Sequence, residues 1–250
     1  MDKIIDIARR AGEEILKVYN DPDKYGAVEI KADNSPLTKA DKDSHILIMR
    51  ELSKISSLPI ISEEAETLGY DIRKNWEEYW LVDPLDGTKE FINRNGEFTV
   101  NISLIKNKNP ILGVIHVPVK DITYFGKLGE GAYLKRGKNN PIVIKVNNKS
   151  TDLIAVRSKS HATEEEETVL SNYGISDSIS VGSSLKFCMV AEGKADIYYR
   201  HGPTMEWDIA AGHAILKASG GNVYKGSTTD QPFTYNKEDL LNGSFIALGF

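Results

Sequence analysis

The chain has 250 residues, with 36 Asp and Glu against 31 Lys and Arg, and 40% of the sequence is hydrophobic. This length can bury one large core or two closely packed halves. The net charge of −5 argues against general nucleic-acid binding, and the single cysteine excludes an internal disulfide and fits a reducing cytoplasm.

The chain begins with two predicted helices. Residues 1–20 combine acidic side chains with apolar ones at helical spacing, which predicts an amphipathic helix packed on the core and excludes a signal peptide or a membrane span. A second helix is expected after Asp41, with Ile48, Leu52 and Ile55 as its buried stripe.

A short buried strand is predicted next, over residues 59–62, and it ends in the carboxylates of Glu63 and Glu64. Taken alone, an acidic pair of this kind is usually solvated. A functional role for this pair depends on which other acidic segments lie nearby in the fold.

The most informative stretch runs from Trp80 to Thr88, where an apolar run leads into the string D-P-L-D-G-T. The proline stiffens the backbone between Asp83 and Asp86, so both carboxylates and the Leu85 carbonyl can converge on a hard cation such as Mg2+. A helix that begins after Gly87 would direct unpaired N–H groups at an anion, and a phosphoryl group fits that place. Ordinary turn punctuation is the alternative for Asp-Gly alone, but the whole string favours a functional site.

The pattern of the following residues predicts an antiparallel meander and then an alternation of strands and helices from residue 150 onward. Residues 106–109 and 135–140 read as hairpin turns. The change of pattern places a soft boundary near 149–153, which divides the chain into halves 1–150 and 151–250. The expected strands cover 98–105, 111–117, 123–125, 131–134 and 153–157.

The C-terminal half adds a third acidic segment. Residues 206–213 predict an apolar, alanine-rich helix with Asp208 near its start, where an acid is most often a cap. Cys188 lies in an apolar helix pattern, which indicates core packing and not a reactive thiol.

Three basic residues of this half are candidates for binding an anionic, aromatic ligand. His161 follows the expected strand 153–157, and Lys186 and Arg200 flank a helix-strand unit. Solvated surface charge is the alternative for the two cations, and a place beside a helix cap is the alternative for His161.

The acidic segments suit phosphate ester hydrolysis. A phosphate monoester dianion repels hydroxide, and two Mg2+ ions about 3.5–4 Å apart supply the positive charge and the activated water that hydrolysis needs. Direct attack by water is favoured over a phospho-enzyme, since the candidate segments contain no activated Cys or His that must act as nucleophile.

Three segments in this order resemble the inositol monophosphatase superfamily of Mg2+-dependent, lithium-sensitive phosphatases, and the resemblance spans essentially the whole chain. They are residues 62–64, 83–88 and 207–212. Within the superfamily, residues 86–91, 95–102 and 182–188 resemble the CysQ-type 3'(2'),5'-bisphosphate nucleotidases. The resemblance implies an α+β fold of the sugar-phosphatase type, layered α/β/α/β/α, with metals between the halves.

The resemblance also implies roles for single residues. Two or three Mg2+ ions would be held by Glu63, Asp83, the Leu85 carbonyl, Asp86 and Asp208. Catalysis would involve Glu63 and Thr88, which orient a metal-bound water, and Asp41, which hydrogen-bonds Thr88. The substrate would be bound by Gly87, Thr88, His161, Ser183, Lys186, Arg200 and Asp208.

The sequence therefore predicts a cytoplasmic enzyme that converts adenosine 3',5'-bisphosphate to AMP and phosphate. Its expected partner is this small bisphosphate nucleotide, with no nucleic-acid polymer and no stable protein partner. A peripheral place at the inner membrane, and a monomer or a homodimer, remain open. The alternatives are an inositol or sugar monophosphatase and a non-catalytic nucleotide or metal sensor on the same fold.

Overall fold

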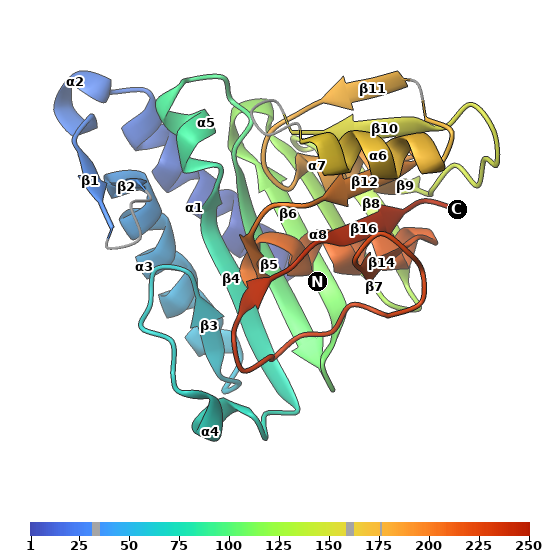
Figure 1. Cartoon of the computed structure of the whole chain (residues 1–250). Helices are drawn as coiled ribbons and strands as arrows, with labels where there is room; N and C mark the ends of the chain where they lie inside the picture. Colours follow the sequence, from blue (N-terminus) through green and yellow to red (C-terminus); the bar gives the residue numbers. More distant parts are fainter. Residues whose placement is uncertain (32–35, 159–162, 176) are drawn as a thin grey trace.

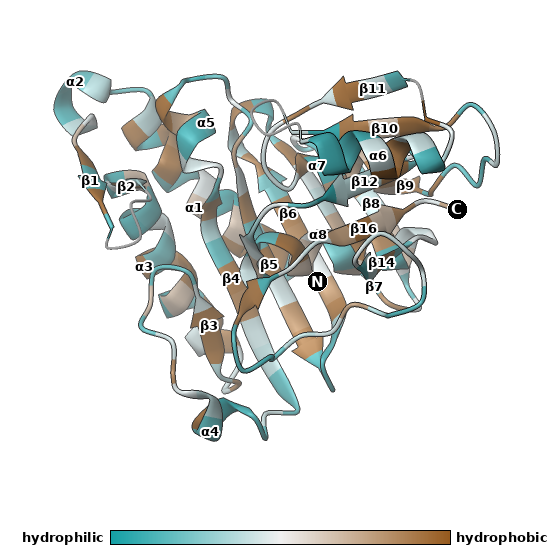
Figure 2. Cartoon of the chain, viewed as in Figure 1, coloured by the Kyte–Doolittle hydropathy of each residue, from teal (hydrophilic) through white to brown (hydrophobic). Residues whose placement is uncertain are grey.

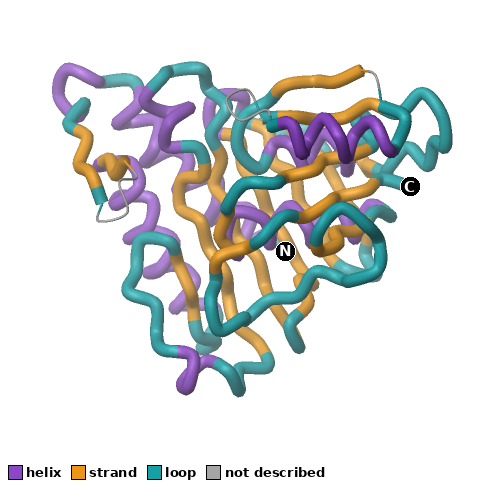
Figure 3. Tube along the Cα trace, in the orientation of Figure 1, coloured by secondary structure: helices purple, strands orange, loops and turns teal. Residues whose placement is uncertain are grey.

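The computed structural model describes residues 1–31, 36–158, 163–175 and 177–250. Helices and sheets alternate through the molecule in five layers (Figures 1 and 3). In order, the layers are helices α1 and α3, a seven-stranded sheet, helices α7 and α8, a five-stranded sheet and helix α6. The α/β/α/β/α fold class expected from the sequence is confirmed.

The seven-stranded sheet is the meander predicted from the strand patterns. Only its first pair of strands, β3 with β4, is parallel, and the other neighbours are antiparallel. The predicted turns at 106–109 and 135–140 connect neighbouring strands. The strands are β3 Ile60–Ser62, β4 Glu78–Asp86, β5 Thr99–Lys106, β6 Asn109–Val117, β7 Ile122–Lys127, β8 Gly131–Arg136 and β9 Ile142–Ile144.

Two long helices, α1 (Asp2–Tyr19) and α3 (Lys39–Ile55), cover one face of this sheet. Helix α1 buries the apolar stripe expected of it. Helix α3 begins two residues before Asp41, so this acid caps the helix from its first turn instead of preceding it. Ile48 and Leu52 are fully buried, but the expectation for Ile55 was wrong. As the last residue of α3, Ile55 is 38% exposed and borders a surface groove beside α1.

Helix α8 (Glu206–Ser219) lies between the two sheets and is buried on both sides, which explains its apolar, alanine-rich sequence. Its approach to the larger sheet depends on Gly113 of β6, where a Cβ atom would lie 2.3 Å from the Ala211 carbonyl oxygen. This close packing holds the first half of α8, which carries Asp208, against β6.

The five-stranded sheet runs in the order β11-β10-β12-β16-β14 and has both faces covered. Tyr198 and Phe245 pack towards α7 and α8, whereas Tyr199 and Ile246, their neighbours in sequence, pack towards α6. Helix α6 presents a hydrophilic surface to solvent (Figure 2). The elements are β10 Ile154–Arg157, α6 Glu164–Asn172, β11 Asp177–Ser180, α7 Leu185–Ala191, β12 Ile197–Arg200, β14 Asn222–Lys225 and β16 Phe245–Leu248.

Short elements complete the chain. The hairpin of β1 and β2 leads into α3, and the β13–β15 pair leads into α8. Across the described ranges, no helix is both long and apolar enough to cross a membrane. The short elements are α2 Pro22–Tyr25, β1 Val28–Ile30, β2 Pro36–Thr38, α4 Tyr70–Arg73, α5 Thr88–Ile92, the 3-10 helix Pro118–Lys120, β13 Thr204–Met205 and β15 Leu241–Asn242.

Candidate active site

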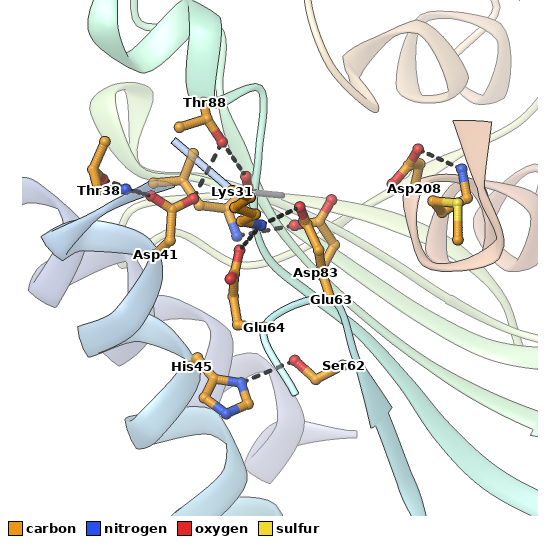
Figure 4. Close-up of polar contacts among 12 residues, drawn as sticks. Lys31, Thr38, Asp41, His45, Ser62, Glu63, Glu64, Asp83, Thr88 and Asp208 are labelled. Atoms are coloured by element: carbon orange, nitrogen blue, oxygen red, sulfur yellow. Dashed lines mark hydrogen bonds and ion pairs between the residues drawn. The ribbon is translucent and has the colours of Figure 1, made fainter. Parts of the chain in front are cut away.

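The acidic segments meet where β3, β4 and α8 converge. Because β3 and β4 are parallel, their carboxyl ends lie at the same edge of the sheet. Glu63 follows β3, Asp86 ends β4, and Asp83 lies inside β4 near that end. Asp208 enters from α8, and the Met205 N–H donates to its Oδ2 at 2.8 Å. In Figure 4, Glu63 and Asp83 lie together and Asp208 lies apart from them, at the start of α8.

A bulge in β4 sets the positions of the two aspartates. The pairing register with β5 shifts between Asp83 and Asp86, as expected where a proline interrupts a ladder. The bulge is held by Ser44, whose hydroxyl donates to the Pro84 carbonyl oxygen at 2.7 Å, and by the Leu85 N–H, which donates to Asp83 Oδ1 at 3.0 Å. The bulge separates Asp83 from Asp86, and the predicted convergence of their carboxylates on one cation stays a prediction.

Burial and mutual repulsion dominate the electrostatics of this acidic cluster. Asp83 is 1% exposed, and burial together with the charges of Glu63, Asp86 and Asp208 raises its pKa well above the usual range. Burial and the Asp86 charge likewise raise the pKa of Asp208. Burial raises the pKa of Glu63 too, although the Lys31 ammonium opposes that effect. Buried carboxylates of this kind need a compensating cation.

The donors in the cluster fit a hard divalent cation. Carboxylate and carbonyl oxygens are the ligands that Mg2+ and related ions prefer. As they stand, no three acidic, histidine or cysteine side chains in the described ranges are close enough to ligate one ion. The fit therefore rests on the oxygen chemistry of the donors and on the crowding of buried carboxyl groups in the cluster, and not on a preformed cage.

Thr88 and Asp41 form a hydrogen-bonded pair beside the cluster. The Thr88 hydroxyl lies 3.2 Å from Asp41 Oδ1 and 3.5 Å from the Leu85 carbonyl oxygen. Asp41 is held by the N–H and hydroxyl of Thr38, which both donate to its Oδ2. Burial raises the pKa of Asp41, and the hydrogen bonds from Thr38 oppose the rise. The hydrogen bond between Asp41 and Thr88 that the resemblance implied is present.

Asp86 faces a second polar network, which the sequence analysis did not assign to the site. Its Oδ2 accepts from the Ser184 N–H at 2.5 Å and from Asn101 Nδ2 at 3.3 Å. The Ser184 hydroxyl in turn donates to the Asp208 carbonyl oxygen at 2.6 Å and accepts from Asn101 at 2.9 Å. Ser184 thus links the Asp86 carboxylate of one half to the backbone of Asp208 in the other. The sequence did contain a signal for this network, because Asn101 and Ser184 lie in segments 95–102 and 182–188, which both resemble the nucleotidases.

The substrate-binding candidates line two adjoining cavities that share Asp86, Arg200 and Asp208. The larger, of about 660 Å3, reaches Glu63 and Thr88, and the smaller, of about 180 Å3, reaches Ser183 and Lys186. Gly87 lines both cavities with a backbone φ of +93°, a left-handed conformation that favours glycine. His201 also lines the larger cavity and was not predicted. His161 lies outside the described residues.

The two cations at these cavities are not solvated surface charges. Lys186 is 6% exposed, its ammonium donates to the Ser183 carbonyl oxygen at 2.7 Å, and burial lowers its pKa to about 8 against the opposing charge of Asp86. Arg200 Nε is buried and has no hydrogen-bond partner within the described part of the chain. A buried donor without a partner fits an acceptor brought by a ligand.

Comparisons with known proteins agree over nearly the whole chain. A profile of the inositol monophosphatase family matches residues 1–247. The chain is 45% identical to the 3'(2'),5'-bisphosphate nucleotidase CysQ of Escherichia coli K12, over 98% of either chain, and 46% identical to that of Buchnera aphidicola, over 100% of this chain and 92% of the relative.

Solved structures agree with the sequence matches. The crystal structure of CysQ from Bacteroides thetaiotaomicron superposes with a TM-score of 0.87 at 45% identity, over 99% of this chain and 96% of that one. The inositol monophosphatase of Anabaena gives 0.76 at 25% identity, over 100% and 90%. The chain therefore belongs to the metal-dependent inositol monophosphatase family and, within it, resembles the CysQ proteins most strongly among these relatives.

Proposed function

We propose that this protein is a Mg2+-dependent 3'(2'),5'-bisphosphate nucleotidase that converts adenosine 3',5'-bisphosphate to AMP and phosphate. The observation that carries the proposal is a cleft with two chemically different sides. The half-buried carboxylates of Glu63, Asp86 and Asp208 line one side. The buried Lys186 and the half-buried Arg200, whose Nε is buried, line the other. The names of the relatives that match the chain almost end to end support the same activity.

The acidic side would hold two or three Mg2+ ions through Glu63, Asp83, the Leu85 carbonyl, Asp86 and Asp208. Bound there, Mg2+ supplies positive charge to the phosphoryl oxygens and lowers the pKa of water. Residues 1–150 contribute most of these ligands, and residues 151–250 contribute Asp208 and the cations. In this proposal the N-terminal half mainly binds the metal ions, and the C-terminal half mainly binds the substrate.

Thr88 and Glu63 position the attacking water. A hydroxyl has a single hydrogen, and Thr88 directs it towards Asp41, so its lone pairs are left to accept a hydrogen bond from water. Glu63, which lines the same cavity, accepts the second. Water held at both hydrogens presents its oxygen lone pair to the phosphorus. Asp41 thus acts through Thr88 and does not touch the substrate.

Water and not a protein side chain is the nucleophile in this proposal. Cys188 is fully buried in α7, and burial raises the pKa of its thiol well above the usual range, so it stays protonated. Its predicted place in the core is confirmed. In direct displacement the water oxygen forms a bond to phosphorus as the ester P–O bond breaks, and the water gives up a proton while the ester oxygen leaves as a hydroxyl. Thr88 and Glu63 would orient the water, and bound Mg2+ would supply the charge stabilisation.

The cationic side selects a second phosphate. A bisphosphate carries a charge remote from the acidic cluster, and Lys186, Arg200 and Ser183 supply donors for it. Gly87, His161 and Asp208 complete the proposed substrate-binding set. An inositol monophosphate has no second phosphate and would leave Lys186 and Arg200 without an anionic ligand group, which favours the nucleotide as substrate.

Phosphate release tests the proposal. The purified protein is assayed on adenosine 3',5'-bisphosphate, inositol 1-phosphate and fructose 1,6-bisphosphate, with Mg2+ and with EDTA, beside an Asp83→Asn variant. Asp71→Asn is the matched control, because the Asp71 side chain is 93% exposed on α4. We expect a strong preference for the nucleotide that EDTA and Asp83→Asn abolish and Asp71→Asn leaves intact. A preference for inositol 1-phosphate or the sugar would move the substrate assignment. No metal-dependent turnover on any substrate would favour a non-catalytic sensor.

A further inference from the structure

Lys31 lies inside the acidic cluster although no role has been assigned to it. It follows β1, and its ammonium donates to Glu63 Oε1 at 2.9 Å and to Glu64 Oε1 at 2.6 Å. The side chains of Lys31 and Glu64 are only 19% and 8% exposed. Figure 4 shows Lys31 reaching between Asp41 and Thr88 on one side and Glu63, Glu64 and Asp83 on the other.

This contact differs from the surface ion pairs of the same region. Lys42 pairs with Glu29 of β1 at 2.7 Å, but both side chains are largely solvated, at 45% and 65% exposure. Exposed pairs of that kind contribute little to any equilibrium. Lys31 instead pairs with a carboxylate that the proposed function assigns to a divalent cation.

We infer that Lys31 is a built-in counter-ion that competes with the divalent cation for Glu63. An ammonium and a divalent cation on one carboxylate repel each other, so Lys31 on Glu63 weakens binding of the cation, and the cation in turn favours movement of Lys31 away from Glu63. Glu64 gives Lys31 a carboxylate on which to remain. Lys31 therefore sets the cation affinity of the site and links β1 to cation occupancy. The inference rests on the proposed function, which places the cation at Glu63.

The direct test is calorimetric titration of Mg2+ into protein stripped with EDTA, without substrate. For Lys31→Gln we expect binding tighter by about tenfold, equivalent to about 1.4 kcal/mol. Lys31→Arg retains the charge and should bind Mg2+ as the wild type does. Lys42→Gln removes one charge from the same region without touching Glu63, and should stay within about twofold of the wild type.

Glu64→Gln supplies an independent arm if Lys31→Gln fails to fold, as judged by circular dichroism. With Glu64 neutral, Lys31 is confined to Glu63, so Mg2+ binding should weaken. A simple loss of negative charge would weaken binding by the same factor with and without Lys31. Our inference predicts that the factor is larger when the positive charge of Lys31 is present. A double-mutant cycle with Lys31→Gln, or with Lys31→Met as a second neutral replacement, measures the difference.

The outcomes separate this inference from the proposed function. If the wild type binds Mg2+ and Lys31→Gln binds it equally or more weakly, Lys31 is a structural ion-pair partner and the inference is wrong, while the function stands. If the wild type binds no divalent cation, the proposed function fails and the inference fails with it. Tighter binding in Lys31→Gln alone, rescued by arginine, supports the inference.

Discussion

Replacing Lys186 with methionine should separate recognition of the second phosphate from catalysis. Methionine keeps the length and apolar stem of the buried side chain, and removes the ammonium. One hydrogen of that ammonium is used by the Ser183 carbonyl, so two remain for a ligand. A hydrogen bond to a charged group contributes about 1.5–3 kcal/mol, and its loss should lower kcat/KM by roughly 10- to 150-fold.

The loss should depend on the substrate. We expect it for adenosine 3',5'-bisphosphate and not for adenosine 3'-monophosphate, which lacks the second phosphate. Steady-state kinetics on both substrates measures the difference. Lys194→Met is the matched control, because Lys194 follows the same helix, α7, and its side chain is 53% exposed. An equal loss on both substrates would contradict the assignment of Lys186 to the second phosphate.

Three further predictions concern the framework of the site. Ser184→Ala removes a buried hydroxyl that bonds both Asn101 and the Asp208 carbonyl. Urea unfolding should show that the free energy of unfolding falls by about 1–3 kcal/mol, and an unchanged midpoint would contradict this prediction. Gly87→Ala forces a side chain into a φ of +93° and should cost about 1–2 kcal/mol with lower activity, whereas wild-type stability would contradict the strain argument. His213 is 2% exposed, and burial lowers its pKa from 6.5 to about 3. As pH falls, the unfolded chain therefore takes up a proton at a higher pH than the folded protein does. The stability present above pH 6.5 is lost as pH falls towards 3. Between about pH 7.5 and about pH 5 the wild type should therefore lose about 2 kcal/mol more than His213→Gln in urea unfolding, and equal losses would contradict the pKa assignment.

Local patterns in the sequence predicted the elements that carry the acidic cluster. The alternation in the meander strands and the apolar run before Asp83 are both patterns of residues close together in the sequence, so they can be read without knowing the fold. The bulge at Pro84 was not predicted, although the missing N–H of proline explains it. The layered fold, in contrast, was expected from the resemblance, because no local pattern says which sheet faces which helix.

Contacts between distant segments escaped the sequence analysis. Ser184, Asn101 and the Asp208 carbonyl meet only after the two halves pack, and a hydroxyl or amide carries no periodic signal. The ion pair of Lys31 with Glu63 and Glu64 joins residues more than thirty apart for the same reason. The prediction that Ile55 is buried was wrong because helical periodicity does not reveal where the covering sheet ends.

The most direct test of the account is a crystal structure of the protein with Mg2+, AMP and inorganic phosphate. We expect metal density between Glu63, Asp83, Asp86 and Asp208, free phosphate beside it, and the AMP phosphate on Lys186 and Arg200. Metal density elsewhere, or AMP bound with its phosphate away from both cations, would contradict the central claim that one cleft joins an acidic metal side to a cationic phosphate side.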